Sequence, residues 1–372
     1  MQAVGRGRLF GGEPVYLDHA ATAPVRPEVV AAMAEAMAQR GNPSSLHMAG
    51  RRARELVERA RRRLADRLKV APDRVIFTSG GTEANHLALS GTGGHCLVSA
   101  VEHASVMEAV SAATHIPVDD DGRIDLAVMR DLLVRHRPRM TSVMLANNET
   151  GVIQPIVEAA RLAHAHGSLF HCDAIQAFGK LPFSLADLDV DLLSVSAHKI
   201  GGPPGIGALI LREGYEPQPL QRGGGQERQR RAGTENLPGI VGFGTALELA
   251  TDWVGVMELR AHLEAQVCAA PFDAQIIGVA ADRLPSVTSI VTPGLAAETQ
   301  LMALDLAGVA VSSGSACSSG KIGASHVLAA MGLAPGLARC AIRVSLGWSS
   351  TAEHVARFVQ AWTELAGRRR GP

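Results

Sequence analysis

Short apolar runs alternate with longer amphipathic segments along most of the chain. The short runs predict buried strands, and the longer segments, with apolar residues at helical spacing, predict helices. The predicted strands are Val75–Thr78, His95–Ser99, Thr141–Ala146, Ser168–Cys172, Leu192–Ser196 and Gly207–Leu211. The predicted helices are Glu28–Gln39, Ala49–Leu68, Glu83–Ser90, Ser105–Ala112, Leu126–His136 and Pro155–His166.

This alternation predicts an α/β fold in which crossover units build a mainly parallel sheet flanked by helices. From about residue 250 the pattern changes to a long helix, short strands and a closing helix, at Ala246–Ala270, Pro285–Val291, Val309–Ser312, Ile342–Ser345 and Thr351–Ala366. We therefore expect a large α/β domain over residues 16–250. A smaller α+β domain is expected over residues 251–372, joined by the N-terminal residues 1–15.

Composition narrows the class of protein. Hydrophobic residues make up 47% and charged residues 19%, which favours a large core over disorder. The formal net charge of +0 and an aromatic content of 3% argue against direct nucleic-acid binding. No apolar stretch reaches membrane-spanning length and the start has no signal-peptide pattern, so we expect no membrane contact and a cytoplasmic location. Five scattered cysteines without a CxxC pair argue against a metal site, yet leave room for one reactive thiol.

The most informative segment is SAHKIGGPPG, in which Lys199 follows a buried strand and precedes a Gly/Pro loop. Partial burial lowers the pKa of a lysine, and the neutral amine can then attack an aldehyde. Ligands of parallel sheets bind beyond the carboxyl ends of the strands, where this lysine is expected. Lys199 is therefore a candidate for covalent attachment of an aldehyde cofactor.

Other strand ends carry complementary groups. Gly81 and Thr82 open a helix after a glycine turn, where free N–H groups bind an anion. Asp173 follows a strand, and a carboxylate there can keep a pyridine nitrogen protonated. His103 follows another strand and could stack on an aromatic ring and shuttle protons. Arg343 could grip an α-carboxylate with its planar fork. These groups, together with Lys199, are the parts of a pyridoxal-phosphate site.

The same residues lie in motifs that resemble the cysteine desulfurases of the NifS/IscS type. The motifs run from about Tyr16 to Trp348 and include YLDHAATAPV, FTSGGTEANH, EHASV, NNETGV, HCDAIQAFGK, SAHKIGGPPGIGAL, GGGQERQRRAGTEN, SSGSACSSG and IRVSLG. The resemblance implies the PLP-dependent transferase fold of type I, with class V aminotransferase-like architecture, pyridoxal 5′-phosphate as cofactor, and a homodimer. Relative to IscS-type members, we expect this chain to lack the C-terminal extension that holds their scaffold partner.

The resemblance also implies a role for each matching residue. Lys199 would bind the cofactor aldehyde, Asp173 would pair with the pyridine nitrogen, and His103 would stack on the ring as acid and base. Arg343 would bind the substrate carboxylate, and Cys317 would be the sulfur-accepting nucleophile. The remaining cofactor contacts would be Gly81, Thr82, Ser196 and His198 at the phosphate, Gln176 and Asn148 near the phenolic oxygen, with Asn148 also near the substrate carboxylate, and Thr234 at the phosphate of the partner subunit's cofactor.

The activity so implied converts L-cysteine to L-alanine and passes sulfur through a persulfide on Cys317 to an acceptor protein. Iron–sulfur cluster assembly is the expected pathway, and tRNA thiolation or molybdenum-cofactor sulfuration would need the same donor. An aminotransferase or selenocysteine lyase of the same fold is the alternative, because one fold hosts many chemistries. A transaminase has no need of Cys317. A non-catalytic scaffold would not need the complete set of Lys199, Asp173, His103 and Cys317.

Overall fold

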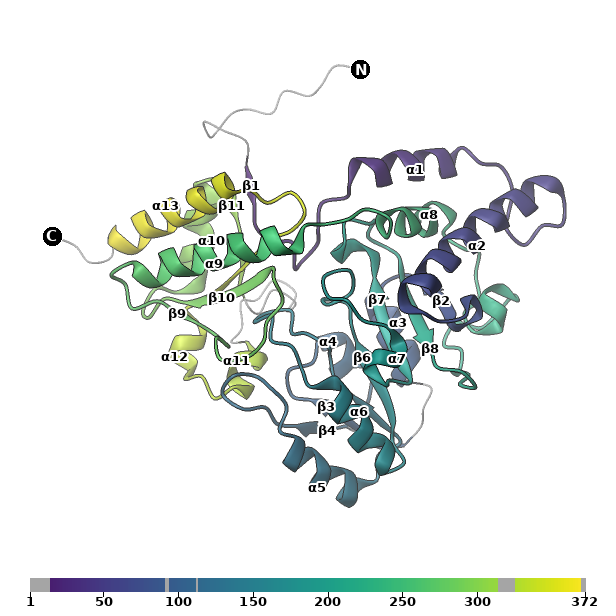
Figure 1. The fold of residues 1–372 in the computed structure, drawn as a ribbon, viewed down its shortest axis with the longest axis horizontal. Helices are drawn as coiled ribbons and strands as arrows, with labels where there is room; N and C mark the ends of the chain where they lie inside the picture. Colours follow the sequence, from purple (N-terminus) through teal and green to yellow (C-terminus); the bar gives the residue numbers. More distant parts are fainter. Residues whose placement is uncertain (1–13, 91–93, 112, 314–324, 369–372) are drawn as a thin grey trace, which may run out of the picture.

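The computed structural model describes residues 14–90, 94–111, 113–313 and 325–368 (Figure 1). Its centre is a seven-stranded sheet in the order β2-β8-β7-β6-β5-β3-β4. Every pairing from β7 to β4 is parallel, and β8 runs antiparallel to β7 and β2. The expected mainly parallel sheet is therefore confirmed. Its strands are β2 (Val75–Thr78), β3 (Cys96–Ser99), β4 (Ala113–Ile116), β5 (Met140–Ser142), β6 (Leu169–Asp173), β7 (Leu192–Ser196) and β8 (Gly207–Leu211).

Helices cover both faces of this sheet, so its strands are apolar on both sides. In β7, Leu193 faces the core beneath α2, α5, α6 and α8, whereas Leu192 faces a second core beneath α3 and α4. Alternate residues of a strand point to opposite faces, which is why a continuous apolar run suits this position. The flanking helices are α1 (Pro27–Met37), α2 (Met48–Leu68), α3 (Gly81–Leu89), α4 (Ala104–Met107), α5 (Leu126–His136), α6 (Ile156–Ala165), α7 (Leu185–Leu188) and α8 (Leu237–Ala246).

A smaller layer lies beside the large sheet, around Trp362 and Phe358, which are fully buried. Its four-stranded sheet has the order β12-β13-β10-β9, and β1 pairs with β11 in parallel. The N-terminal segment thus packs on the small layer before entering the large one. The elements are β1 (Val15–Tyr16), α9 (Trp253–Ala269), β9 (Gln275–Ile276), β10 (Val287–Val291), α10 (Ala297–Leu306), β11 (Val309–Ala310), β12 (Ser312–Ser313), α11 (His326–Ala330), α12 (Pro335–Ala338), β13 (Ala341–Ser345) and α13 (Ala352–Arg368). The domain limits stay a prediction.

The structure corrects two expectations and adds strands β1, β4 and β9, which the sequence pattern did not predict. The single helix expected over Ala246–Ala270 is wrong, because α8 ends at Ala246 and α9 begins at Trp253. The side chain of Asp252 caps α9 by accepting from the backbone N–H of Gly255 at 3.0 Å, a helix start placed inside the predicted helix. The helix expected over Ser105–Ala112 is only the short α4. The unpredicted β4 is an edge strand with one buried residue, so it lacks a strong apolar signal.

No helix of the described ranges combines the length and the apolar character that crossing a membrane requires.

Candidate active site

The carboxyl ends of β3, β6 and β7 meet at one edge of the large sheet, because these strands run in the same direction. His103 follows β3, Asp173 is the last residue of β6, and Lys199 closes a short 3₁₀ turn (η2, Ala197–Lys199) directly after β7. The sheet therefore delivers the three predicted side chains to one place. Binding sites of parallel sheets form at this edge.

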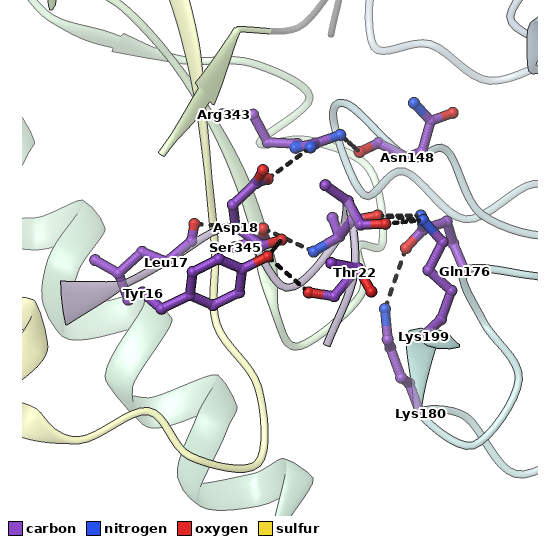
Figure 2. Close-up of polar contacts among 12 residues, drawn as sticks. Tyr16, Leu17, Asp18, Thr22, Asn148, Gln176, Lys180, Lys199, Arg343 and Ser345 are labelled. Atoms are coloured by element: carbon purple, nitrogen blue, oxygen red, sulfur yellow. Dashed lines mark hydrogen bonds and ion pairs between the residues drawn. The ribbon is translucent and has the colours of Figure 1, made fainter. Parts of the chain in front are cut away.

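The amine of Lys199 points at the backbone of the N-terminal segment (Figure 2). Its Nζ donates hydrogen bonds to the carbonyl oxygens of Ala20 at 2.6 Å and Ala21 at 2.7 Å. The turn that carries Lys199 is followed by Gly201, whose φ of 81° is in the left-handed region, and a Cβ there would lie 2.9 Å from the side chain of Arg26. The loop that follows the lysine therefore needs glycine at this position.

Asp173 is a buried carboxylate with two donors. Its Oδ1 accepts from the backbone N–H of Ile175 at 2.9 Å, and its Oδ2 accepts from Asn85 Nδ2 at 2.8 Å. Burial raises the pKa of Asp173, while these hydrogen bonds and the nearby His103 and Lys199 act in the opposite direction. Asp173 is therefore a desolvated carboxylate of fixed orientation, which suits it to bind a positively charged group.

The imidazole of His103 is tied into the same network. Its Nδ1 lies 2.8 Å from Ser105 Oγ, which also accepts from Asn85 Nδ2 at 2.8 Å. Burial lowers the pKa of His103, so the neutral ring is favoured near neutral pH, although the charge of Asp173 opposes this effect. Sequence reasoning missed Asn85 and Ser105. The available signal was spacing, since Asn85 lies one helical turn after Gly81 and so on the same face of α3.

The start of α3 forms a concave backbone surface beside these groups. The N-cap is Gly80, which offers no side-chain hydrogen bond, so the first N–H groups of α3, at Gly81 and Thr82, remain available to an anion. A Cβ on Gly81 would lie 2.2 Å from Ile175 Cδ1, so only glycine fits there. Ser196 ends β7 close by, since its Cβ would lie 3.7 Å from that added carbon.

His198 lies in η2 beside Lys199, and Thr234 lies near the turn that precedes α3. His198 Nδ1 lies 3.3 Å from Thr22 Oγ1, and burial, with the charges of Lys199 and Lys180, lowers its pKa to about 4. Thr234 lines a hollow together with Ser79 at the turn before α3. Whether Thr234 serves a partner subunit stays a prediction.

Arg343 brings the small layer to the site. It lies on β13 and is 2% exposed. Its Nη2 donates to Asp18 Oδ1 at 2.8 Å, and its Nη1 donates to the carbonyl oxygen of Asn148 at 2.9 Å (Figure 2). Its Nε is buried without a partner among the described residues. The structure thus brings Arg343 and Asn148 together, and Asp18 is a partner that the sequence pattern did not indicate.

Gln176 spans two groups near Lys199. Its Nε2 donates to the Ala20 carbonyl oxygen at 2.9 Å, and its Oε1 accepts from Lys180 Nζ at 3.2 Å. Burial, with the charges of Lys199 and Arg343, lowers the pKa of Lys180 to about 7. Lys180 was also missed, because a lysine in GKLP looks like a surface residue in the sequence.

The predicted nucleophile Cys317 lies outside the described residues. The next described residue after that gap, Ser325, caps α11 and donates to Glu149 Oε2 at 2.5 Å, beside Asn148. Within the described ranges, no group of three or more histidine, cysteine, aspartate or glutamate side chains is arranged to hold a metal ion.

Comparisons with known proteins agree on one family. The aminotransferase class-V family model matches residues 15–358. A cysteine desulfurase of Cereibacter sphaeroides is 43% identical over 94% of this chain and 94% of its own, and the cysteine desulfurase IscS of Dictyoglomus turgidum is 41% identical over 91% of each. The X-ray structure of a NifS-like protein from Rickettsia africae superposes with a TM-score of 0.89 at 33% identity, covering 95% of this chain and all of that one.

Proposed function

The chain belongs to the aminotransferase class-V family, in its cysteine desulfurase branch, and from this premise we propose that it removes sulfur from L-cysteine and releases L-alanine. Enzymes of this family depend on pyridoxal 5′-phosphate. The observation that carries the proposal is the meeting of Lys199, Asp173 and His103 at one sheet edge, opposite Arg343.

The residues present fit this cofactor. A phosphate suits the start of α3, because its N-cap, Gly80, makes no side-chain hydrogen bond to the first N–H groups. The buried carboxylate of Asp173, held by Asn85, suits a protonated pyridine nitrogen. Lys199 would hold the aldehyde. We propose that Thr82, Ser196 and His198 hold the phosphate with Gly81, and that Gln176 and Asn148 lie near the phenolic oxygen.

When bound, the cofactor withdraws electrons from the substrate α-carbon and so acidifies its proton. Lys199 would hold the cofactor aldehyde, and its Nζ, once free, would take the α-proton. The carbonyl oxygens of Ala20 and Ala21 accept hydrogen bonds from that amine. Asp173 would keep the cofactor's ring nitrogen protonated.

Arg343 would bind the substrate carboxylate. Its fork is already fixed by Asp18 and the Asn148 carbonyl, so little side-chain entropy is lost on binding. Burial lowers the pKa of His103, so its neutral ring can accept and return a proton. These residues orient cysteine, and they leave its sulfur for a nucleophile.

We propose that this nucleophile is the thiolate of Cys317. It attacks the substrate sulfur, the carbon–sulfur bond breaks, and the substrate carbon takes a proton. One cysteine and the Cys317 thiol thus become one alanine and a Cys317 persulfide, with no external oxidant or reductant. The persulfide sulfur then passes to an acceptor protein, and we propose that this acceptor belongs to iron–sulfur cluster assembly. The homodimer and the cytoplasmic location stay predictions.

Product analysis tests this function against the alternatives. The purified protein, loaded with pyridoxal 5′-phosphate and given L-cysteine and a reductant, should form alanine and sulfide in equal amounts. Formation of a keto acid in place of alanine would identify an aminotransferase. Turnover of selenocysteine but not of cysteine would identify a selenocysteine lyase. A protein that takes up no cofactor would support the non-catalytic scaffold.

A further inference from the structure

Lys180 is a buried lysine that has no carboxylate partner in the part of the chain that the structure describes. It lies after β6, it is 6% exposed, and its Nζ donates a hydrogen bond to Gln176 Oε1 at 3.2 Å. Burying an unpaired amine is costly, because charge loses its hydration and gains no compensating ion pair. A lysine retained in such a place calls for a role that a hydrocarbon side chain cannot fill.

A short hydrogen-bond path leads from Lys180 to Lys199 (Figure 2). Lys180 donates to one end of the Gln176 amide, and the other end donates to the Ala20 carbonyl oxygen at 2.9 Å. The same carbonyl oxygen accepts from Lys199 Nζ at 2.6 Å. Lys180 therefore fixes which way the Gln176 amide faces, and that amide fixes the carbonyl against which Lys199 rests.

Lys180 and Lys199 also line one small cavity. His19 borders the same cavity, and both of its ring nitrogens are buried without a described partner. The charged or titratable groups that act on Lys180 are Lys199 and Arg343, while Lys180 itself acts on His19 and His198. Arg343 is paired with Asp18, and an acidic group that interacts with Lys199 is the buried carboxylate of Asp173.

Two amines in such a setting weaken each other's hold on a proton. The charge of Lys199 lowers the pKa of Lys180. The repulsion between two like charges is mutual, so a positive charge on Lys180 disfavours a second positive charge beside it. An amine that must attack an aldehyde and accept a proton from carbon works only in its neutral form. When Lys199 is bonded to the cofactor, the positive charge of Lys180 would act on the bonded nitrogen.

We propose that Lys180 is a positioning residue for Lys199, which aligns the amine through Gln176 and the Ala20 carbonyl and favours its neutral form by its own positive charge. The role of Lys180 rests on the proposed function, but the quantity measured is the proton affinity of the Lys199 nitrogen alone. It can therefore be tested apart from desulfuration.

The test is a pH titration of the visible absorbance of the full-length, cofactor-loaded protein, which reports the protonation of the nitrogen that joins Lys199 to the cofactor. Wild type is compared with Lys180→Met, which removes the charge, and Lys180→Arg, which keeps it. Lys69→Met is the matched control, because Lys69 is exposed and its ion pair with Asp187 is long, at 3.9 Å. Lys180→Gln replaces Lys180→Met if the latter does not fold.

We expect the titration midpoint to rise by about one pH unit in Lys180→Met or Lys180→Gln, which is a tenfold change in proton affinity. Lys180→Arg and Lys69→Met should stay at the wild-type midpoint. An unchanged midpoint in both uncharged variants, or an equal shift in Lys69→Met, would overturn the inference.

A second measurement keeps the inference separate from the proposed function. Competitive labelling of amines in the full-length chain before cofactor addition gives the pH at which Lys199 becomes reactive, and it needs neither cofactor nor cysteine. A higher labelling midpoint in Lys180→Met supports the inference even if no alanine is ever formed. An unchanged labelling midpoint overturns it even if the desulfurase activity is present.

Discussion

Replacing Glu227 with glutamine should destabilise the protein by about 3–5 kcal/mol, the cost of leaving a buried charge without its partner. The side chains of Arg61 and Glu227 are 7% and 3% exposed, and they pair through two contacts of 2.7 Å. Glu227 Oε2 also accepts from the backbone N–H of Phe77 at 2.9 Å. The Glu227→Gln variant keeps the shape of the side chain but leaves Arg61 only the more exposed Glu58, at 3.2 Å, as a carboxylate partner among the described residues.

The pair also holds an unusual piece of backbone. Glu227, Arg228 and Gln229 have φ values of 44°, 58° and 68°, so three successive non-glycine residues adopt left-handed conformations. Each such residue costs about 1–2 kcal/mol, which the surrounding contacts must offset. Loss of the pair should therefore release this turn as well. The turn leads to Thr234, so cofactor affinity should fall with stability if Thr234 binds a phosphate.

Urea unfolding followed by circular dichroism measures the effect, with pH and salt held constant. Glu248→Gln is the matched control, because Glu248 pairs with Arg63 at the same 2.7 Å but the two side chains are 52% and 31% exposed. An exposed pair contributes less than about 1 kcal/mol. If Glu227→Gln lowers the free energy of unfolding no more than Glu248→Gln does, the reasoning about the buried pair is refuted.

Three further predictions concern the site itself. Lys180→Met should raise the free energy of unfolding by up to about 4 kcal/mol at pH 7, and this gain should vanish toward pH 10.5. The pKa of Lys180 falls from 10.5 to about 7 on folding, so between these pH values the unfolded chain binds a proton that the folded chain does not. A gain that does not depend on pH would contradict this prediction. Asp173→Asn should slow alanine formation by about 100-fold while cofactor is still bound, and a wild-type rate would show that the carboxylate has no role. Arg343→Lys should raise the KM for cysteine by at least about tenfold, because the planar fork is lost; an effect confined to kcat would place Arg343 elsewhere in the reaction.

The sequence pattern predicted β2, β7 and β8 well, because all their residues are buried and they stand out as apolar runs between turns. It failed where the signal is weak or mixed. The edge strand β4 has one buried residue, and the break between α8 and α9 depends on the capping by Asp252 inside an otherwise helical stretch.

In the site, too, residues with a clear sequence signal were predicted and residues without one were missed. Lys199, Asp173 and His103 were found because the rule that ligands bind at strand ends applies to each of them separately. The contacts Asn85–Asp173 and Asp18–Arg343 join residues far apart in the chain, and no local pattern indicates them. Lys180 could not be recognised at all, since only its burial distinguishes it from a solvated lysine.

The most direct test of the proposed function is mass spectrometry of the cofactor-loaded protein after a single turnover with L-cysteine, without reductant. We predict one additional sulfur atom on the peptide that contains Cys317, in amounts equal to the alanine released. Cys317→Ala should bind cofactor and cysteine as wild type does, but gain no sulfur and release no alanine. Alanine formation at the wild-type rate in Cys317→Ala, or sulfur on a different cysteine, would contradict the proposed function.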